Sequence, residues 1–308
     1  MNRAKLSDTW ASDSTAGSIW PPFCCPLHPK VALKTIRGIP DGLFCTYCGM
    51  HPIRDGIPRL VPAGSWQEEA IRAEAKQWDR EANEYDERRG SDGRYMAAIE
   101  AAVRNLNVQP TDTVLDAACG TGMTTRRLLA SGCRVTGLDL SIESLNWLRD
   151  RTAGQTLRVV QGDLTRLPFN DGSFDRVLCA NALQQLHESD QRASAVRELA
   201  RVLKPGGRIV VTAQQYSLPR RWAGWVKEGS TGCRVRYIYR FSREEFAVLL
   251  ARMTNNAKVR GAGFPLPYRF KLGVVSRWVE RTLQRPSLPT ALADLLVGVV
   301  DAPDQAKS

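Results

Sequence analysis

The sequence predicts an α/β protein whose core is an open, mostly parallel sheet. A short apolar run at residues 113–115 is typical of a buried strand. A turn with Gly120 and Gly122 follows it, and then a helical pattern around Leu128 and Leu129. Two glycines separated by one residue let the backbone pass close to a ligand, because no Cβ stands in the way. A strand, a glycine-rich turn and a helix in this order form the ligand-binding end of such a sheet.

Polar residues close three further predicted strands. These strands are residues 134–139, 157–163 and 174–181, which end in Asp139, Asp163 and Asn181. Asp139 lies about 20 residues after the glycine turn, where nucleoside-binding α/β units carry an acidic residue for the ribose hydroxyls. The carboxyl ends of parallel strands share one rim of the sheet, so these groups are expected at a common site. A fifth strand follows the Pro205-Gly206-Gly207 turn and ends near residue 213.

Five motifs occur in the order known from one family. They read LDAACGTG at 115–122, GLDLS at 137–141, GDL at 162–164 with LPF at 167–169, DGSFD at 171–175 and RELARVLKPGG at 197–207. This set resembles class I S-adenosylmethionine-dependent methyltransferases, especially the ubiquinone/menaquinone-biosynthesis-like branch, over about residues 78–213. A dinucleotide-binding domain fits less well, because the turn lacks a third glycine at dinucleotide spacing. The resemblance implies a Rossmann-like, seven-stranded methyltransferase sheet at 108–270, and the sequence adds an insertion at 214–240.

The resemblance also implies S-adenosylmethionine as the cofactor and assigns its residues. Asp116 and the backbone at Gly120 and Gly122 would hold the methionine portion. Ala118 stands in this turn where the family commonly has glycine. Asp139 would accept hydrogen bonds from both ribose hydroxyls.

Four other residues are assigned to the adenine and the reacting centre. Leu140 would lie against the adenine, whose amino group would donate to Asp163 near the Leu164 amide. Asn181 would face the reacting centre. The competing interpretation of each aspartate is a helix N-cap.

Two residues are candidates for catalysis. His187 lies close to where many relatives carry a histidine, but the matching position is Gln185, so a surface histidine is the alternative. Tyr85 lies in a predicted helix that covers the cofactor in similar enzymes, and simple packing is its alternative. An acidic nucleophile such as a phenol needs little help from a general base.

Residues 20–64 have the spacing of a zinc ribbon. Two pairs of soft ligands, each separated by two residues, flank a short β-rich loop. The predicted ligands are Cys25, His28, Cys45 and Cys48, with Cys24 and His51 as possible substitutes. The segment is too short to bury a sufficient core, so structural zinc would supply folding energy. A degenerate ribbon without metal is the alternative.

The run at 51–60 resembles the tail of zinc-ribbon modules that precede some bacterial methyltransferases. His28 replaces a usual cysteine of those modules, and His51 a usual tyrosine.

The remaining segments are assigned by periodicity. Residues 65–107 are expected to form two helices separated by 90–93, and a further helix starts at Ser242 with Glu245 in capping-box position. A final hairpin is expected at 259–270, and residues 271–308 are expected to form two C-terminal helices and a tail. Residues 1–19 are polar, without periodicity, and are expected to be a disordered tail.

The composition is that of an ordinary globular chain. It has 308 residues, 43% hydrophobic and 24% charged, and no apolar run long enough to span a bilayer. The N-terminus has no secretory h-region. The eight cysteines do not follow a disulfide framework, which predicts a cytoplasmic protein.

The net charge of +11 comes from one segment. Residues 215–285 hold 15 Lys and Arg against four Asp and Glu, whereas the rest of the chain is balanced. The favoured function is methylation of a small-molecule acceptor on O, C or N, with Trp222, Trp225 and Tyr268 as lid and wall of an aromatic or lipid-like site. RNA methylation through the ribbon and the basic segment is the alternative. An anionic membrane surface and a partner protein are further possible ligands of these regions. The oligomeric state is open.

Overall fold

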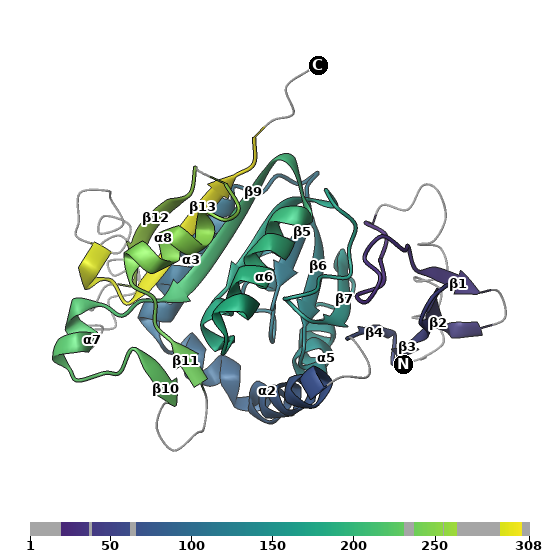
Figure 1. Cartoon of the computed structure of the whole chain (residues 1–308), viewed down its shortest axis with the longest axis horizontal. Coiled ribbons are helices and arrows are strands. Elements are labelled where there is room, and N and C mark those ends of the chain that lie inside the picture. The colour runs from purple at the N-terminus through teal and green to yellow at the C-terminus, as the bar shows by residue number, and fades with distance from the viewer. Residues whose placement is uncertain are drawn as a thin grey trace.

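The computed structural model describes residues 20–36, 39–61, 66–230, 237–254, 256–263 and 290–303. An 11-stranded sheet runs through them in the order β1-β2-β3-β4-β7-β6-β5-β8-β9-β13-β12, beside a two-stranded sheet of β10 and β11. Residues 1–19, predicted as a disordered tail, lie outside the described residues. Figure 1 shows the strands of the N-terminal segment at one end of the molecule and β12 and β13 at the other.

The parallel core contains the five strands that the sequence predicts. They are β5 (Thr113–Ala117), β6 (Arg134–Asp139), β7 (Leu157–Gly162), β8 (Phe174–Ala180) and β9 (Leu203–Gln214). Each pairs in parallel with its neighbours in the order β7-β6-β5-β8-β9. The strand order reverses direction at β5, so a crevice is expected at the carboxyl ends of β5 and β8.

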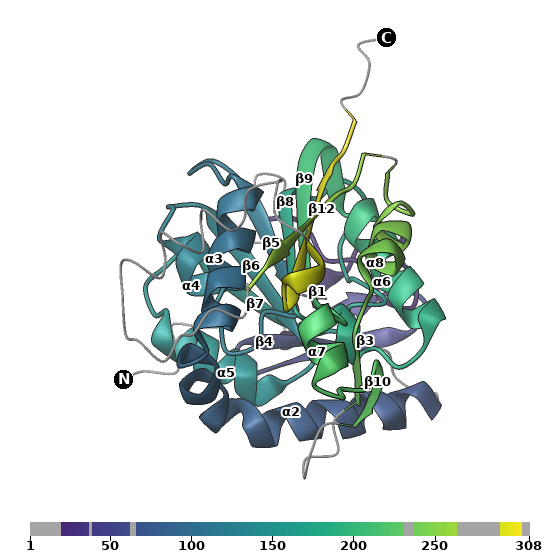
Figure 2. The ribbon, with the colours of Figure 1, turned by 90° about the vertical axis from the view of Figure 1, so that its left-hand side faces the viewer.

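Helices cover both faces of this sheet. Val114 and Leu115 are consecutive in β5 and therefore point to opposite faces. Val114 packs with the buried side of α3 (Gly93–Leu106), and Leu115 shares a core cluster with residues of α6 (Ser189–Arg201) and α8 (Arg243–Leu250). Figure 2 shows the sheet between α3 and α4 (Thr125–Leu129) on one side and α6 and α8 on the other. The predicted Rossmann-like α/β fold is confirmed.

Two predicted helix starts are confirmed by their caps. Asp92 accepts hydrogen bonds from the backbone N–H groups of Arg94 and Tyr95 and so begins α3. Ser242 accepts from the Glu245 N–H, and the Glu245 side chain accepts from the Ser242 N–H, which completes the capping box of α8. The predicted helix pair at 65–107 is present as α2 (Trp66–Gly90) and α3.

The C-terminal prediction was wrong for residues 295–300. Instead of a helix they form β13 (Leu295–Asp301), which pairs antiparallel with β9 and with β12 (Lys258–Ala262). The run Leu-Leu-Val-Gly-Val-Val has no polar helical face and is rich in β-branched residues, so it suits a buried strand. A Cβ on Gly298 would lie 2.1 Å from Leu250 Cδ1, so α8 packs directly on this backbone. The strand β12 pairs with this distant segment rather than within the hairpin predicted at 259–270, and residues 264–289 lie outside the described residues.

The N-terminal segment extends the sheet instead of standing apart from it. Its strands are β1 (Lys34–Ile36), β2 (Ile39–Cys45), β3 (Gly49–Arg54) and β4 (Ile57–Leu60). Asp55 and Gly56 join β3 to β4 with φ of 53° and 72°, the signature of a type I′ hairpin turn. The strand β4 then pairs in parallel with β7, at the edge of the core. We call residues 20–61 the N-terminal module.

The long helix α2 lies along the carboxyl ends of the core strands (Figure 2). Asp79 in α2 accepts hydrogen bonds from Ser141 Oγ at 2.6 Å and Glu143 N at 3.0 Å, at the start of α5 (Ile142–Arg151). Asp86, two turns on, accepts from Thr121 in the glycine turn and forms ion pairs with Arg126 and Arg151. Two carboxylates therefore hold α2 over the loops that follow β5 and β6.

The predicted insertion contains α7 (Leu218–Trp222), β10 (Glu228–Ser230) and β11 (Tyr237–Tyr239).

Candidate functional site

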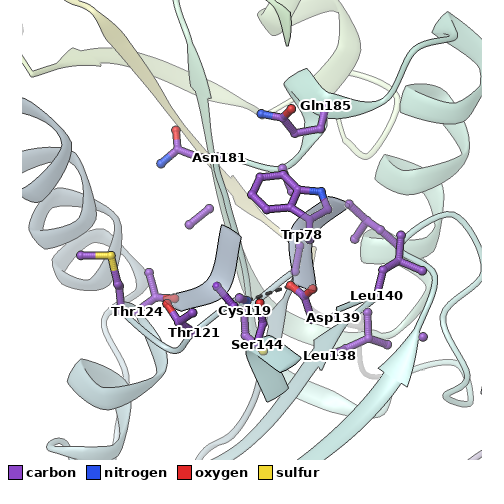
Figure 3. Close-up of a pocket in the computed structure, with 18 of the residues that line it drawn as sticks. Trp78, Cys119, Thr121, Thr124, Leu138, Asp139, Leu140, Ser144, Asn181 and Gln185 are labelled. Carbon is purple, nitrogen blue, oxygen red and sulfur yellow. Dashed lines mark hydrogen bonds between the residues drawn. The ribbon is translucent and has the colours of Figure 1, made fainter. Parts of the chain in front are cut away.

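A pocket lies between α2, α3 and the carboxyl ends of β5, β6, β7 and β8. The described residues that line it are Trp78, Ala82, Tyr95, Ile99, Ala118, Cys119, Gly120, Thr121, Met123, Thr124, Leu138, Asp139, Leu140, Ser144, Gly162, Asp163, Leu164, Ala180, Asn181, Ala182, Gln185 and Leu186. Figure 3 shows Asn181 and Gln185 in one part of the pocket and Thr121, Cys119, Ser144 and Asp139 in another, with Trp78 between them in this view. No Lys, Arg or His occurs among these described lining residues.

The glycine turn forms one end of the pocket. Ala118, Gly120 and Gly122 have φ of 61°, 54° and 89°, all in the left-handed region. A Cβ on Gly122 would lie 2.3 Å from Leu148 Cδ1, so only glycine fits between the turn and α5. The turn thereby exposes its backbone to the pocket.

Asp139 connects this turn to the end of β6. One carboxylate oxygen accepts from Gly120 N at 2.8 Å and the other from Ser141 N at 2.9 Å. Burial raises the pKa of Asp139 to about 6, although these N–H donors favour the carboxylate. A carboxylate has further lone pairs, and Asp139 presents them to the pocket that it lines.

Asp116 lies behind the turn and does not line the pocket. It is fully buried and accepts from Thr124 Oγ1 at 2.7 Å and Thr125 Oγ1 at 2.6 Å. Its other oxygen, Oδ1, has no partner among the described residues. Burial raises the pKa of Asp116 to about 6, and the nearby charge of Asp139 adds to this shift. Asp116 therefore stabilises the start of α4 and leaves one buried acceptor unsatisfied beneath the site.

Asp163 and Leu164 follow β7 and line the far end of the pocket, as does Leu140 after β6. The Asp163 carboxylate accepts from the N–H and the hydroxyl of Thr165, each at 2.8 Å. This turn fixes the direction of the Asp163 side chain.

Asn181 is the most unusual residue of the pocket. Its φ is 56°, and its backbone N–H is held by Thr212 O at 3.0 Å and Thr212 Oγ1 at 3.1 Å. The side-chain oxygen and nitrogen are both buried and find no hydrogen-bond partner within the described part of the chain. Leaving such groups unsatisfied costs about 1–3 kcal/mol each. A strained backbone that directs an unsatisfied amide into a pocket indicates a ligand contact.

A second cluster lies in the N-terminal module. The ligand atoms of Cys25, His28, Cys45 and Cys48 all lie within 4.8 Å of one another. His28 Nδ1 is 3.5 Å from Cys25 Sγ and 3.6 Å from Cys45 Sγ, and the Cys25 and Cys48 sulfurs are 3.4 Å apart. His51 Nε2 lies 3.5 Å from the sulfurs of both Cys25 and Cys48. The structure thus brings the four predicted ligands together and places His51 beside them.

Cys24, the other possible substitute, points away from this cluster. Its sulfur lies 4.0 Å from Leu167 O, and its N–H donates to Pro168 O at 3.0 Å. Cys24 therefore packs the module against the core.

Comparison with known proteins agrees with this geometry. A profile of the methyltransferase domain family matches residues 115–211, from β5 to β9. A demethylmenaquinone methyltransferase of Mycolicibacterium gilvum is 40% identical over 116 residues, which are 37% of this chain and 46% of that protein. The chain thus spans about half the length of the curated relatives it matches.

Two solved structures share the fold. A possible histamine N-methyltransferase from Thermotoga maritima superposes with a TM-score of 0.55 at 19% identity, covering 73% of this chain and 98% of that chain. The 1,6-didemethyltoxoflavin-N1-methyltransferase from Burkholderia thailandensis, solved with bound 1,6-didemethyltoxoflavin and S-adenosylhomocysteine, superposes with a TM-score of 0.51 at 22% identity, covering 79% of this chain and 92% of that chain. Residues 115–211 therefore match a methyltransferase domain, and the fold around them is that of these solved methyltransferases.

Most of the predicted cofactor residues of the methyltransferase domain line one pocket. They are Ala118, Gly120, Asp139, Leu140, Asp163, Leu164 and Asn181. Of the other two, Asp116 lies behind the turn, and Gly122 belongs to the turn and packs against Leu148 of α5. The prediction omitted the walls that α2 and α3 contribute, namely Trp78, Tyr95 and Ile99. Their apolar helical pattern shows that one helix face is buried but not that it faces a ligand.

The structure describes the side chain of only one of the two catalytic candidates, His187. His187 is not among the described lining residues, and its ring stacks on Tyr237 with centroids 4.1 Å apart. Tyr85 lies in α2, and its side chain is outside the described residues. The predicted lid residues Trp222 and Trp225 are 80% and 47% exposed and do not line the pocket, and Tyr268 lies outside the described residues.

Within the described residues, no helix has both the length and the apolarity needed to cross a membrane.

Proposed function

We propose that the protein binds S-adenosylmethionine in this pocket and transfers its methyl group to an uncharged small-molecule acceptor. The observation that carries the proposal is the convergence of Asp139, the left-handed glycine turn and the unsatisfied Asn181 amide on one pocket of the methyltransferase domain. Bound S-adenosylmethionine supplies an electrophilic methyl group, so the chain has mainly to position, orient and desolvate the reactants.

Each part of the lining has a matching task. The free lone pairs of Asp139 accept from the ribose hydroxyls, and the exposed backbone at Gly120 lies beside the methionine portion. Asp163 accepts from the adenine amino group while Leu140 packs on the ring. Asn181, at the carboxyl end of β8, faces the reacting centre.

The electrostatics of the pocket favour an uncharged acceptor. Tyr95, Ile99, Met123 and Leu186 give it apolar walls, and no Lys, Arg or His lies among its described lining residues. An anionic group of the acceptor that lies away from the cofactor's sulfonium would be desolvated there without a compensating cation among these residues, which is costly. Gln185 adds a second carboxamide that can donate or accept. The relative that is named a demethylmenaquinone methyltransferase supports an aromatic or lipid-like acceptor.

The lining also bears on proton transfer. The described lining residues offer no histidine or lysine to take a proton, and Asp139 is assigned to the ribose. We infer an acceptor whose reacting atom is acidic or already nucleophilic, such as a phenol or a heteroaromatic nitrogen. Nothing in the described residues favours the alternative of RNA methylation.

We further propose that the N-terminal module holds a structural zinc ion through Cys25, His28, Cys45 and Cys48. Tetrahedral zinc requires sulfur–nitrogen separations of about 3.6 Å, as follows from the Zn–S and Zn–N bond lengths. The two measured distances from His28 Nδ1 to sulfur, 3.5 and 3.6 Å, fit this geometry. Three thiolates and one imidazole are an accepted structural set, and thiolates suit a reducing compartment such as the cytoplasm.

Two measurements test the proposed function. Titration calorimetry should show S-adenosylhomocysteine binding with a stoichiometry of one. Incubation with methyl-labelled cofactor and fractionated cell extract should place label in the small-molecule or lipid fraction. Label confined to RNA would refute the acceptor class, and the absence of any cofactor binding would refute the function.

A further inference from the structure

We propose that Arg59 of the N-terminal module and Gln161 of β7 are positioning residues for the adenosine half of the cofactor site. The proposal rests on the proposed function, because it concerns the affinity for the same cofactor. It makes the N-terminal module part of the methyltransferase site rather than an appended domain.

The argument begins with the sheet register. Arg59 in β4 lies opposite Gln161 in β7, and Gln161 lies opposite Asp139 in β6. Three adjacent strands therefore place a residue of the module, a linking residue and the ribose carboxylate in one row. All three lie at the carboxyl ends of their strands, where the pocket opens.

Side-chain hydrogen bonds connect Arg59 and Gln161 of this row to Leu140. Arg59 Nη1 donates to Gln161 Oε1 at 3.2 Å, and Gln161 Nε2 donates to Leu140 O at 2.8 Å. Leu140 lines the pocket, and its carbonyl lies between Asp139 and Ser141. The next peptide N–H, that of Ser141, donates to Asp139 Oδ1. A shift of the Leu140 carbonyl would therefore shift both the adenine wall and the ribose carboxylate.

Arginine is suited to fix the orientation of the Gln161 amide. A guanidinium group has only donors, so it can hold the oxygen of Gln161 and not the nitrogen. The amide nitrogen is then directed to the Leu140 carbonyl, which only accepts. Without Arg59, the amide can rotate and present its oxygen to that carbonyl, which loses the hydrogen bond. Arg59 thus acts on the site through Gln161.

The neighbouring residues keep this contact fixed. Ile57, two residues earlier in β4, is fully buried and packs with Cys119, Leu145 and Leu148 beneath the glycine turn. Arg149 of α5 donates to the carbonyl of Asp55 at the turn into β4. The start of β4 is therefore held by α5 and by this apolar cluster, and the strand carries Arg59 to a defined position.

The test compares substitutions that break each bond. Arg59→Met removes the donor, and Gln161→Glu keeps an acceptor for Arg59 but cannot donate to Leu140 O. Each variant should raise the Kd for S-adenosylhomocysteine about 5- to 10-fold, the equivalent of one lost hydrogen bond of ordinary strength. The double variant should be little weaker than either single one, because both act on the same carbonyl. Arg59→Lys should restore most of the affinity.

Controls separate positioning from folding. The Kd for 5′-methylthioadenosine, which lacks the amino acid portion, should rise by the same factor, while zinc content and melting temperature stay at the wild-type values. Arg54→Met, an exposed arginine of β3 in the same module, should leave the Kd unchanged. Wild-type affinity in Arg59→Met, or fully additive effects in the double variant, would overturn this proposal alone. A wild-type protein that binds no S-adenosylhomocysteine would overturn the proposed function with it.

Discussion

Replacing Asp139 with alanine is the sharpest test of the proposed site. The carboxylate holds Gly120 N and Ser141 N at 2.8 and 2.9 Å and presents its remaining lone pairs to the pocket. We propose that two ribose hydroxyls donate to it. The substitution removes both acceptors and leaves the strand that carries them unchanged.

The expected loss follows from the number of bonds. A hydrogen bond to a charged group contributes about 1.5–3 kcal/mol. Water reaches the pocket and replaces part of this energy, so two bonds give a loss of about 3 kcal/mol. This corresponds to an increase of roughly 150-fold in the Kd for the cofactor. The folded state loses little, because the two N–H groups can bond to water and the removed carboxylate was itself desolvated, as its raised pKa of about 6 indicates.

Titration calorimetry with S-adenosylhomocysteine measures this change directly, and thermal unfolding should show a melting temperature within about 4 °C of wild type. Asp150→Ala is the matched control, since the Asp150 side chain is 73% exposed and does not line the pocket. It should leave the Kd unchanged. An Asp139→Ala variant that folds and binds within threefold of wild type would refute the assignment of the ribose site.

Four other substitutions or conditions test separate parts of the structure. Burial raises the pKa of both Asp116 and Asp139 to about 6. The ribose hydroxyls need an ionised acceptor, and of these two carboxylates only Asp139 lines the pocket, so cofactor affinity should be constant above about pH 7 and fall by up to tenfold per pH unit below pH 6. A flat calorimetric profile from pH 5 to 8 would contradict this. Cys45→Ser should lower the zinc content from one equivalent to none and lower the melting temperature, and wild-type protein without zinc by metal analysis would exclude the metal. Ala118→Gly should stabilise the fold by about 1 kcal/mol in denaturant unfolding, since glycine relieves the left-handed strain at a smaller entropic cost; a loss of stability would show that the turn is not strained. Asn181→Ala should lower kcat about tenfold and change the Kd for S-adenosylhomocysteine less than threefold, whereas a raised Kd with an unchanged kcat would make Asn181 a cofactor residue only.

The sequence predicted the part of the site that depends on strand ends. Asp139, Asp163 and Asn181 each follow an apolar run, and parallel strands with right-handed connections bring such positions to one rim without further information. The glycine turn could also be predicted, because its two glycines are one residue apart in the sequence and need no distant contact.

The sequence could not predict contacts made by segments far apart in the chain. The run at 295–301 joins β9 although more than 80 residues separate them, and a short apolar run fits a buried helix as well as a strand. Likewise, the apolar periodicity of α2 predicts a buried face but not that Trp78 faces the pocket. The pairing of β4 with β7 also depends on tertiary packing, since Arg59 and Gln161 carry no motif.

Backbone strain is concentrated where the strand order reverses. Ala118 follows β5 and Asn181 follows β8, and both adopt left-handed φ values, of 61° and 56°. For alanine this conformation costs about 1–2 kcal/mol, whereas asparagine adopts it more readily. The two residues contribute differently to the pocket. Ala118 opens the turn as the common glycine would, whereas Asn181 tolerates the conformation and in addition directs an amide into the pocket. Strain at Ala118 can therefore be relieved by glycine without loss of chemistry. Strain at Asn181 cannot, because the side chain that tolerates it is also the one that the proposed acceptor contacts.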